Sequence, residues 1–214
     1  MNVVIFGGTG GLGSRISEMF GVIPVTSVGS KDVDVRDFNA VKEFFAGRED
    51  DVVINLSGVN HDSFAHKITQ SNYDAVNAQL DTNIRGTINI VSNCLPHMRE
   101  KGFGRIITAS SVLAERPVVG TSVYAGCKGF IDSFTKTVAL ENASKNVTCN
   151  SIQLGYFDSG LTWRIPEEIR TTLIGGIPMG RLGMAAELFN TITFLIGTSY
   201  VTGTNIKING GIDF

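Results

Sequence analysis

The stretch GGTGGLG (residues 7–13) follows directly on the apolar run VVIF (3–6) and leads into a helical pattern at 12–20. Gly7, Gly11 and Gly13 have the spacing G-x-x-x-G-x-G. Glycine permits a tight turn and lets backbone N–H groups at a helix N-terminus approach a phosphate. A glycine-rich turn without a ligand is the alternative. At the start of an alternating chain, however, this strand–turn–helix unit favours nucleotide binding and restricts the fold to the α/β class.

Short apolar runs alternate with longer helical patterns along the whole chain. Strands are expected at 3–6, 22–27, 51–58, 104–111, 147–155 and 204–210, and helices at 12–20, 38–47, about 70–100, 123–143 and 185–197. This alternation predicts a Rossmann-type, doubly wound parallel sheet with three αβα layers, in a single domain covering residues 1–214. Pro24 weakens the second strand, and Pro96 is expected to end or kink the long helix.

The link after the second strand is unusually short. Only VGSKDVD separates that strand from an apparent third strand near Val33–Val35. A parallel crossover needs about a dozen residues or more. Either the connecting helix is missing or the third strand is vestigial.

The composition excludes several kinds of partner. Apolar residues make up 43% of the 214 residues and the formal net charge is −2, which argues for a sizeable core and against nucleic acid or an anionic membrane as partner. The three cysteines lack paired spacing, and the three histidines lack the spacing of metal ligands. We therefore expect free thiols in a reducing compartment and no metal site. With neither signal peptide nor membrane span apparent, we expect a cytoplasmic protein.

Four polar residues could form a proton-transfer site. Tyr124 and Lys128 lie four residues apart in SVYAGCKG (122–129), so a helix would place them on one face. Ser111 ends an expected strand, and Asn83 lies in the long expected helix. Each alone has an ordinary explanation as a turn residue or a solvated helix face. Together they suggest that Ser111 holds a carbonyl oxygen, that Tyr124 exchanges its proton, and that Asn83 holds a water serving Lys128. We expect cationic Lys128 to lower the pKa of Tyr124 from about 10 toward neutrality.

In these residues the chain resembles the classical short-chain dehydrogenase/reductase family, and most closely its 3-oxoacyl-acyl-carrier-protein reductases. The resemblance covers nearly the whole chain. Asn83, Ser111, Tyr124 and Lys128 match the family's Asn-Ser-Tyr-Lys tetrad. The resemblance implies that the cofactor is bound by Tyr124 and Lys128 together with Gly7, Gly11, Leu12, Gly13, Asp34, Val35, Asn55, Ser57, Gly58, Gly155, Phe157 and Ser159.

The chain departs from the family pattern at a few positions. Phe6 replaces a Thr before the first glycine, Leu56-Ser57 replaces Asn-Ala, Leu154 replaces a Pro, and Ser159 replaces a Thr but keeps a hydroxyl. None of these changes removes a catalytic group.

The resemblance implies hydride transfer between a nicotinamide and a carbonyl or secondary alcohol, an EC 1.1.1 activity. The best specific interpretation is a 3-oxoacyl-thioester reductase of fatty acid biosynthesis. Two alternatives stay open: an alcohol or ketone oxidoreductase of secondary metabolism, and a non-catalytic NAD(P)-binding sensor.

Cofactor preference depends on the residues after the second strand. Ser27 and Lys31 would suit a 2′-phosphate, and no acid occurs before Asp32, so NADP is favoured over NAD. Against this, Gly10 stands where NADP enzymes of the family often carry a basic residue.

A substrate lid is expected around 156–180. Its residues Leu161, Trp163, Ile165 and Ile169 suit an apolar or acyl substrate, or else pack the lid onto the body. An acidic acyl-carrier protein could meet Arg116, Arg164 and Arg170. The resemblance also implies a homotetramer or homodimer, with the helices at 70–100 and 123–143 forming one interface.

Overall fold

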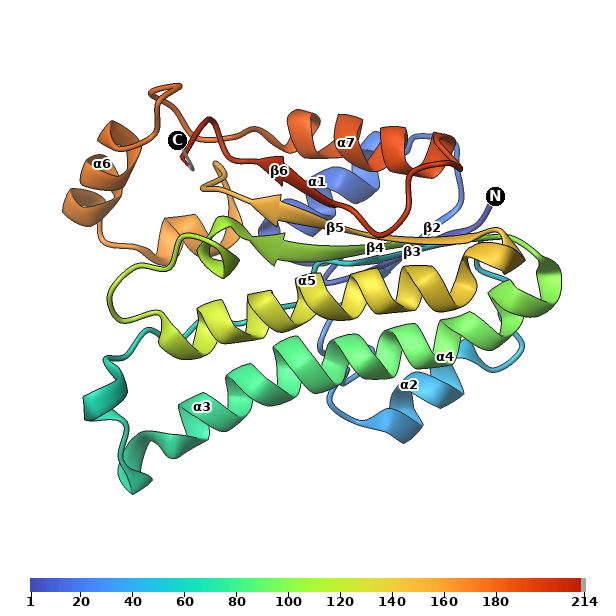
Figure 1. Cartoon of the computed structure of the whole chain (residues 1–214), viewed down its shortest axis with the longest axis horizontal. Coiled ribbons are helices and arrows are strands. Elements are labelled where there is room, and N and C mark those ends of the chain that lie inside the picture. The colour runs from blue at the N-terminus through green and yellow to red at the C-terminus, as the bar shows by residue number, and fades with distance from the viewer. Residues whose placement is uncertain (213–214) are drawn as a thin grey trace.

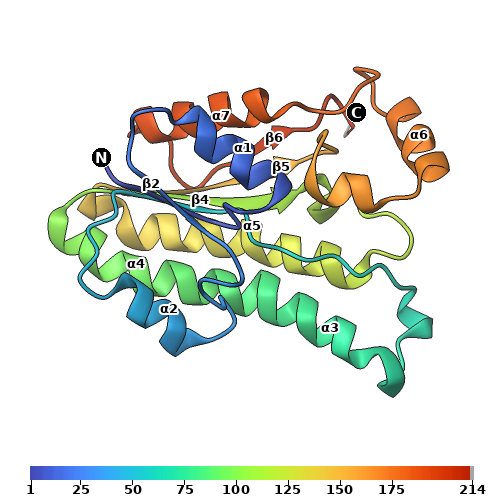
Figure 2. The same cartoon turned by 180° about the vertical axis from the view of Figure 1, so that it is seen from behind.

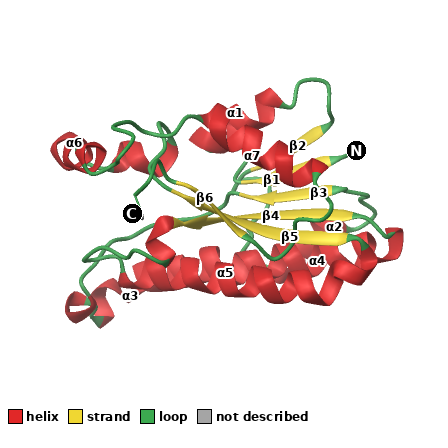
Figure 3. Cartoon of the chain, turned by 45° about the horizontal axis from the view of Figure 1, so that its top comes forward, coloured by secondary structure: helices red, strands yellow, loops and turns green. Residues whose placement is uncertain are grey.

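The computed structural model describes residues 1–212 and is built on a six-stranded sheet in which all neighbouring strands are parallel. The strand order is β2-β1-β3-β4-β5-β6. The strands are β1 (Val3–Phe6), β2 (Val25–Val28), β3 (Val52–Asn55), β4 (Gly104–Ser111), β5 (Val147–Leu154) and β6 (Asn205–Ile208). Because the strands are parallel, their carboxyl ends and the loops that follow them gather at one end of the sheet, as Figure 3 shows.

Helices cover both faces of the sheet (Figures 1 and 2). One face carries α1 (Gly11–Met19) and α7 (Ala185–Gly197), and the other carries α2 (Phe38–Phe45), α4 (Gly86–Lys101) and α5 (Ser122–Asn142). A further helix, α3 (Tyr73–Gln79), continues through a π-helical segment, Leu80–Arg85, into α4. Short 3-10 turns occur at Ala65–Lys67, Gln70–Asn72, Val112–Ala114, Ala143–Lys145 and Gly160–Arg164. The predicted Rossmann-type αβα architecture is confirmed.

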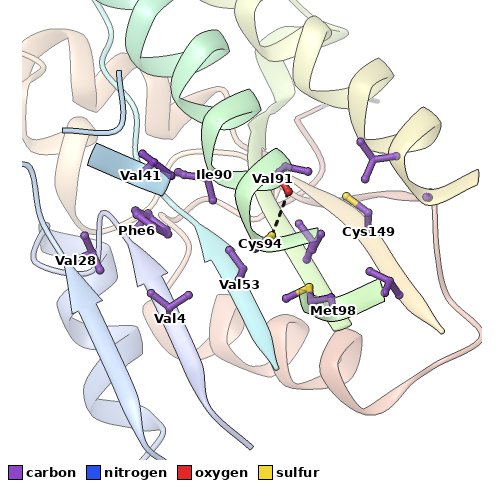
Figure 4. Close-up of a cluster of buried hydrophobic side chains, with 14 residues drawn as sticks. Val4, Phe6, Val28, Val41, Val53, Ile90, Val91, Cys94, Met98 and Cys149 are labelled. Atoms are coloured by element: carbon purple, nitrogen blue, oxygen red, sulfur yellow. Dashed lines mark hydrogen bonds between the residues drawn. The ribbon is translucent and has the colours of Figure 1, made fainter. Parts of the chain in front are cut away.

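Alternate strand residues feed two apolar layers. In β1, Val4 and Phe6 join the layer under α2, α4 and α5, which Figure 4 shows. Val3 and Ile5 join the layer under α1 and α7. The Phe6 ring packs edge-on against Phe44 of α2 at a centroid distance of 5.3 Å. The departure from the family pattern at position 6 is therefore a core-packing feature.

No strand forms near Val33–Val35, which agrees with the alternative that the apparent third strand is vestigial. The Asp32 carboxylate accepts a hydrogen bond from Gly29 N at 2.8 Å, and the Asp34 carboxylate accepts one from Arg36 N at 3.0 Å. These bonds fold the segment into turns, and Val35 packs against α4. The chain then enters α2 directly, which leaves β2 as an edge strand of the sheet.

Other boundaries also differ from the sequence predictions. The second strand begins only after Pro24, at Val25. Pro96 does not end α4, which runs on to Lys101; its ring lies on the exposed side of the helix, where a missing N–H leaves no buried polar group unpaired. The segment 156–180, for which no helix is expected, contains α6 (Glu167–Gly175). Within residues 1–212, no helix combines the length and the apolar character needed to span a membrane.

Candidate active site

The π-helical segment Leu80–Arg85 turns Asn83 into the protein interior, where it is fully buried. Its Nδ2 donates to Val59 O at 2.8 Å, and its Oδ1 accepts from Val59 N at 3.0 Å. The Asn83 amide therefore fixes the loop after β3 by bonding both the backbone N–H and the backbone carbonyl of Val59. π-bulges are frequent at functional sites because they redirect side chains out of the regular helical pattern.

Lys128 lies beside this loop and is only 3% exposed. Its Nζ donates to Ala109 O of β4 at 2.8 Å and lies 5.5 Å from the centroid of the Tyr124 ring. A Cβ on Gly58 would stand 3.1 Å from Asn83 Oδ1 and 3.7 Å from Lys128 Nζ. The absence of a side chain at Gly58 therefore keeps a small space between the amide and the ammonium.

Ser111 completes the group at the carboxyl end of β4. Its Oγ accepts from Leu113 N at 3.2 Å, and a hydrogen bond between Ser111 and Tyr124 lowers the pKa of the phenol. The structure thus brings together all four residues predicted for the proton-transfer site, from the π segment, β4 and α5.

The pKa values differ from the sequence expectation. Burial raises the pKa of Tyr124 above its usual value, the Asp62 carboxylate raises it further, and the bond with Ser111 only partly opposes them. Desolvation is the largest cause, so the expectation that the pKa of Tyr124 falls toward neutrality is wrong. Burial also lowers the pKa of Lys128 to about 8.

The glycine loop fits a dinucleotide. Gly7 has a φ of +76°, and a Cβ there would lie 2.8 Å from Ser57 N, so this loop and the turn after β3 touch. A Cβ on Gly11 would lie 2.8 Å from Ser159 Oγ, and one on Gly13 would collide with Gly7 O. Helix α1 begins after Gly10 with no side-chain cap and no acidic residue in its first turn. Its N–H groups are therefore available to an anion.

Other predicted cofactor residues lie in the turns after β3 and β5 and at the start of α1. Asn55 Oδ1 accepts from Ser57 N at 3.0 Å, while its Nδ2 donates to Thr87 of α4 at 3.0 Å, which ties the turn after β3 to the helix. After β5, a Cβ on Gly155 would lie 2.7 Å from the Asn209 backbone. Phe157 pairs with Gly183 as an isolated bridge, and its ring is buried. The half-buried Leu12 packs on the apolar layer under α1.

Three further predicted cofactor residues, Asp34, Val35 and Ser27, are bonded to other parts of the chain in this structure. Asp34 forms an ion pair with Arg36 at 2.7 Å, which lowers the pKa of the carboxyl. Val35 O accepts from Asn89 of α4 at 2.9 Å. Ser27 Oγ donates to Ser17 Oγ of α1 at 2.7 Å, and Lys31 is exposed in the turn after β2.

The expected lid is organised by Trp163. Its indole Nε1 donates to Asp158 Oδ1 at 3.0 Å, and the Arg170 guanidinium lies 4.2 Å from the ring centroid. Arg15 of α1 donates to Asp158 O at 3.1 Å, so the base of the lid is tied to the helix that follows the glycine loop. Arg164 and Arg116 are exposed, while Leu161 and Ile165 are half-buried.

Sequence reasoning missed Gln79, which precedes the π segment and is only 1% exposed. Its Nε2 donates to His61 O at 3.0 Å, so it holds the same loop that Asn83 holds. Within residues 1–212 its Oε1 has no hydrogen-bond partner. The i, i+4 spacing of Gln79 and Asn83 was the available signal, because two amides on one helix face are unusual where that face is buried.

The comparisons with known proteins agree with this geometry. A family model described as enoyl-(acyl carrier protein) reductase matches residues 11–213. Nodulation protein G of Azospirillum brasilense is 35% identical over 188 residues, covering 85% of this chain and 75% of the relative. An acetoacetyl-CoA reductase of Allochromatium vinosum is 35% identical, and a 3-oxoacyl-acyl-carrier-protein reductase of Thermotoga maritima is 33% identical, each over 164 residues that cover 76% of this chain and 65% of the relative.

The chain therefore spans 65% to 75% of the length of these relatives. The match of the family model begins at Gly11 and runs through α1, the π segment, β4, α5 and the lid, so it includes all four residues of the proton-transfer site but not β1 or Gly7. By this match and these identities, the chain belongs to the short-chain dehydrogenase/reductase family of NAD(P)-dependent oxidoreductases.

Proposed function

We propose that this protein reduces the 3-oxo group of an acyl thioester. One observation carries the proposal: the Lys128 ammonium is buried, bonded to Ala109 O at 2.8 Å, and directed at the ring of Tyr124, which is itself hydrogen-bonded to Ser111. Burying an ammonium away from water costs free energy, and such groups cluster at functional sites. Here the buried ammonium lies beside a phenol that could donate a proton.

The chain's own residues would hold the dinucleotide along the carboxyl ends of β1, β3 and β5. The N-terminus of α1, with Gly11 and Gly13, would receive the pyrophosphate. Tyr124 and Lys128 would hold the nicotinamide ribose, with Ser159 beside the nicotinamide. When bound, the nicotinamide supplies a hydride to the carbonyl carbon.

The proton would come from Tyr124. Ser111 Oγ would donate a hydrogen bond to the substrate oxygen while the phenol transfers its proton to that oxygen, which gives the 3-hydroxy product. The phenolate left behind would be stabilised by the ammonium of Lys128. The space between Asn83, Gly58 and Lys128 would let a water return the proton from solvent to Lys128 and Tyr124.

Two features support a thioester substrate. The relatives named above include an acetoacetyl-CoA reductase and a 3-oxoacyl-acyl-carrier-protein reductase. The lid presents Trp163 and Ile169, each 54% exposed, at the end of the sheet where the site lies. Apolar side chains placed there would contact an acyl chain. The exposed Arg116 and Arg164 would meet the acidic surface of a carrier protein.

We further propose NADPH as the preferred cofactor, with Ser27 and Lys31 facing the 2′-phosphate. We also propose that the chain forms a single domain that assembles as a homotetramer or homodimer. Cys94, Cys127 and Cys149 are free and buried, which suits a reducing compartment and supports a cytoplasmic location.

The test is a coupled measurement of binding and turnover. Purified protein is titrated with NADPH and with NADH by nucleotide fluorescence, and oxidation of the bound nucleotide is then followed with acetoacetyl-CoA and with a panel of ketones. Turnover of the thioester supports the proposal. Turnover of ketones alone would instead indicate an alcohol or ketone oxidoreductase, and binding without any turnover would indicate a sensor.

A further inference from the structure

The inner face of α5 carries a buried titratable group that the proposed chemistry does not use. Tyr124, Lys128 and Asp132 follow one another at intervals of four residues, so they lie in one row on the helix. Asp132 is only 7% exposed and Lys128 only 3%. A carboxylate and an ammonium therefore lie one helical turn apart, both removed from water.

Neutral donors from β5 hold the Asp132 carboxylate. Ser151 Oγ donates to Oδ1 at 2.8 Å, and Gln153 Nε2 donates to Oδ2 at 2.7 Å. No lysine or arginine of residues 1–212 forms an ion pair with Asp132. The negative charge of a buried carboxylate without an ion-pair partner is not neutralised locally, so it attracts a buried cation nearby.

Lys128, like Asp132, is hydrogen-bonded to a neutral group. Its hydrogen bond goes to a neutral acceptor, Ala109 O. Besides Asp132, its own helix carries four titratable groups: Tyr124 and Cys127 lie within one turn of Lys128, whereas Lys136 and Glu141 are exposed two or more turns away. The amide nitrogen of Gln153, which donates to Asp132, also donates to Glu115 Oε1 in the turn after β4, at 3.0 Å. Glu115 in turn forms an ion pair with Lys207 of β6 at 2.8 Å. From the loop after β3, Asp62 faces Tyr124.

We propose that Asp132 is a positioning residue of the site, whose buried carboxylate keeps Lys128 in the ammonium form and so sets the pH range over which Tyr124 can work. The inference rests on the proposed function, because it assigns a role within the same site. Burial lowers the pKa of Lys128, whereas the charges of Cys127 and Asp132 raise it, in agreement with this role.

The test measures the pKa of Lys128 directly. Protein labelled with ¹³C at lysine Cε is titrated by NMR, and the Lys128 signal is assigned from its loss in Lys128→Met. In Asp132→Asn, which keeps the shape of the side chain, we expect the pKa of Lys128 to fall by about one unit, a tenfold change in its protonation equilibrium. The alkaline limb of the kcat/KM profile should move to lower pH by the same amount, while nucleotide affinity is unchanged.

Two variants separate charge from packing. Ser151→Ala removes one hydrogen bond to Asp132 but keeps its charge, so the pKa of Lys128 should move by less than about a third of the shift in Asp132→Asn. Asp50→Asn removes a carboxylate that is also buried and is bonded to Arg48 at 2.7 Å, at the opposite end of the sheet, and should leave the Lys128 titration unchanged. Should Asp132→Asn not fold, Asp132→Leu removes the same charge and must shift the titration in the same direction.

An unchanged Lys128 titration in folded Asp132→Asn would overturn the inference, and so would an equal shift in Asp50→Asn. The NMR titration needs neither substrate nor cofactor. If wild-type protein turns over no carbonyl substrate while the Lys128 shift is observed, the proposed function fails and the electrostatic coupling stands. If the wild type turns over a thioester but Asp132→Asn shows no shift of the Lys128 titration, the proposed function stands and the role of Asp132 is refuted.

Discussion

Replacing Lys128 by Met should change the pH dependence of stability in a direction that the structure fixes. Burial lowers the pKa of Lys128 from 10.5 to about 8. Between these two values the unfolded chain binds a proton that the folded protein has lost. The stability of the wild type therefore rises with pH across that window. Met at this position carries no proton in either state, so the comparison isolates this one group.

The magnitude follows from the same two pKa values. At pH 7 the lysine is charged in both states and contributes almost no pH dependence. At pH 9.5 most of the folded molecules have lost the proton while most of the unfolded ones keep it. Between pH 7 and pH 9.5, the free energy of unfolding of the wild type should therefore rise by about 2 kcal/mol relative to that of Lys128→Met.

The assay is urea unfolding of both proteins at pH 7 and pH 9.5, followed by circular dichroism at one fixed protein concentration, because assembly would add a concentration-dependent contribution. Lys136→Met, an exposed position on the same helix, measures the effect of losing a surface lysine. If the stability difference between wild type and Lys128→Met changes by less than about 0.5 kcal/mol between the two pH values, Lys128 is not desolvated in solution. The account of the site given above would then be wrong.

Three further predictions use single substitutions. Tyr124→Phe should lower turnover at least about a hundredfold while nucleotide binding survives in fluorescence titration, and normal turnover would remove Tyr124 from the mechanism. Gly11→Ala should weaken nucleotide binding about tenfold or more, because its Cβ would meet Ser159 Oγ at 2.8 Å, whereas Gly126→Ala, with no atom within 4 Å, should bind normally. Gln79→Met should lower the free energy of unfolding by about 1–3 kcal/mol, measured with urea, since His61 O loses its donor.

The alternation of strands and helices could be predicted because each element has its own apolar period. β4 runs over the predicted residues 104–111, and α7 over 185–197. The segment after β2 could not be predicted in this way. Val33 and Val35 alternate with acids as a strand would, but the side chains of Asp32 and Asp34 bond to the local backbone instead. Short polar side chains compete with the sheet for backbone donors, and a pattern of apolar residues does not record that competition.

The four candidate residues could be located from the sequence because Ser111 ends an expected strand and Tyr124 and Lys128 have the i, i+4 spacing of one helix face. The residues that support these four could not be located from the sequence, because their contacts come from other elements of the fold. Asp132 becomes notable only once Ser151 and Gln153 of β5 are seen to face it. Gln79 has only its i, i+4 spacing to Asn83 as a signal in the sequence, and that spacing gains a meaning once its amide is seen to reach the loop after β3. In a sequence, both are ordinary polar residues of a helix.

The electrostatics of the resting site agree with the role of proton donor that the proposed function gives to Tyr124. Burial moves the two partners in opposite directions: the pKa of the Tyr124 phenol rises, while that of the Lys128 ammonium falls to about 8. At neutral pH the tyrosine therefore holds its proton, and the lysine, still below its pKa, is mostly charged. A neutral phenol beside an ammonium is the pair that protonates a carbonyl oxygen and then stabilises the phenolate that results. The resting site therefore holds the proton that reduction of a carbonyl would need, in agreement with the reductase proposed above.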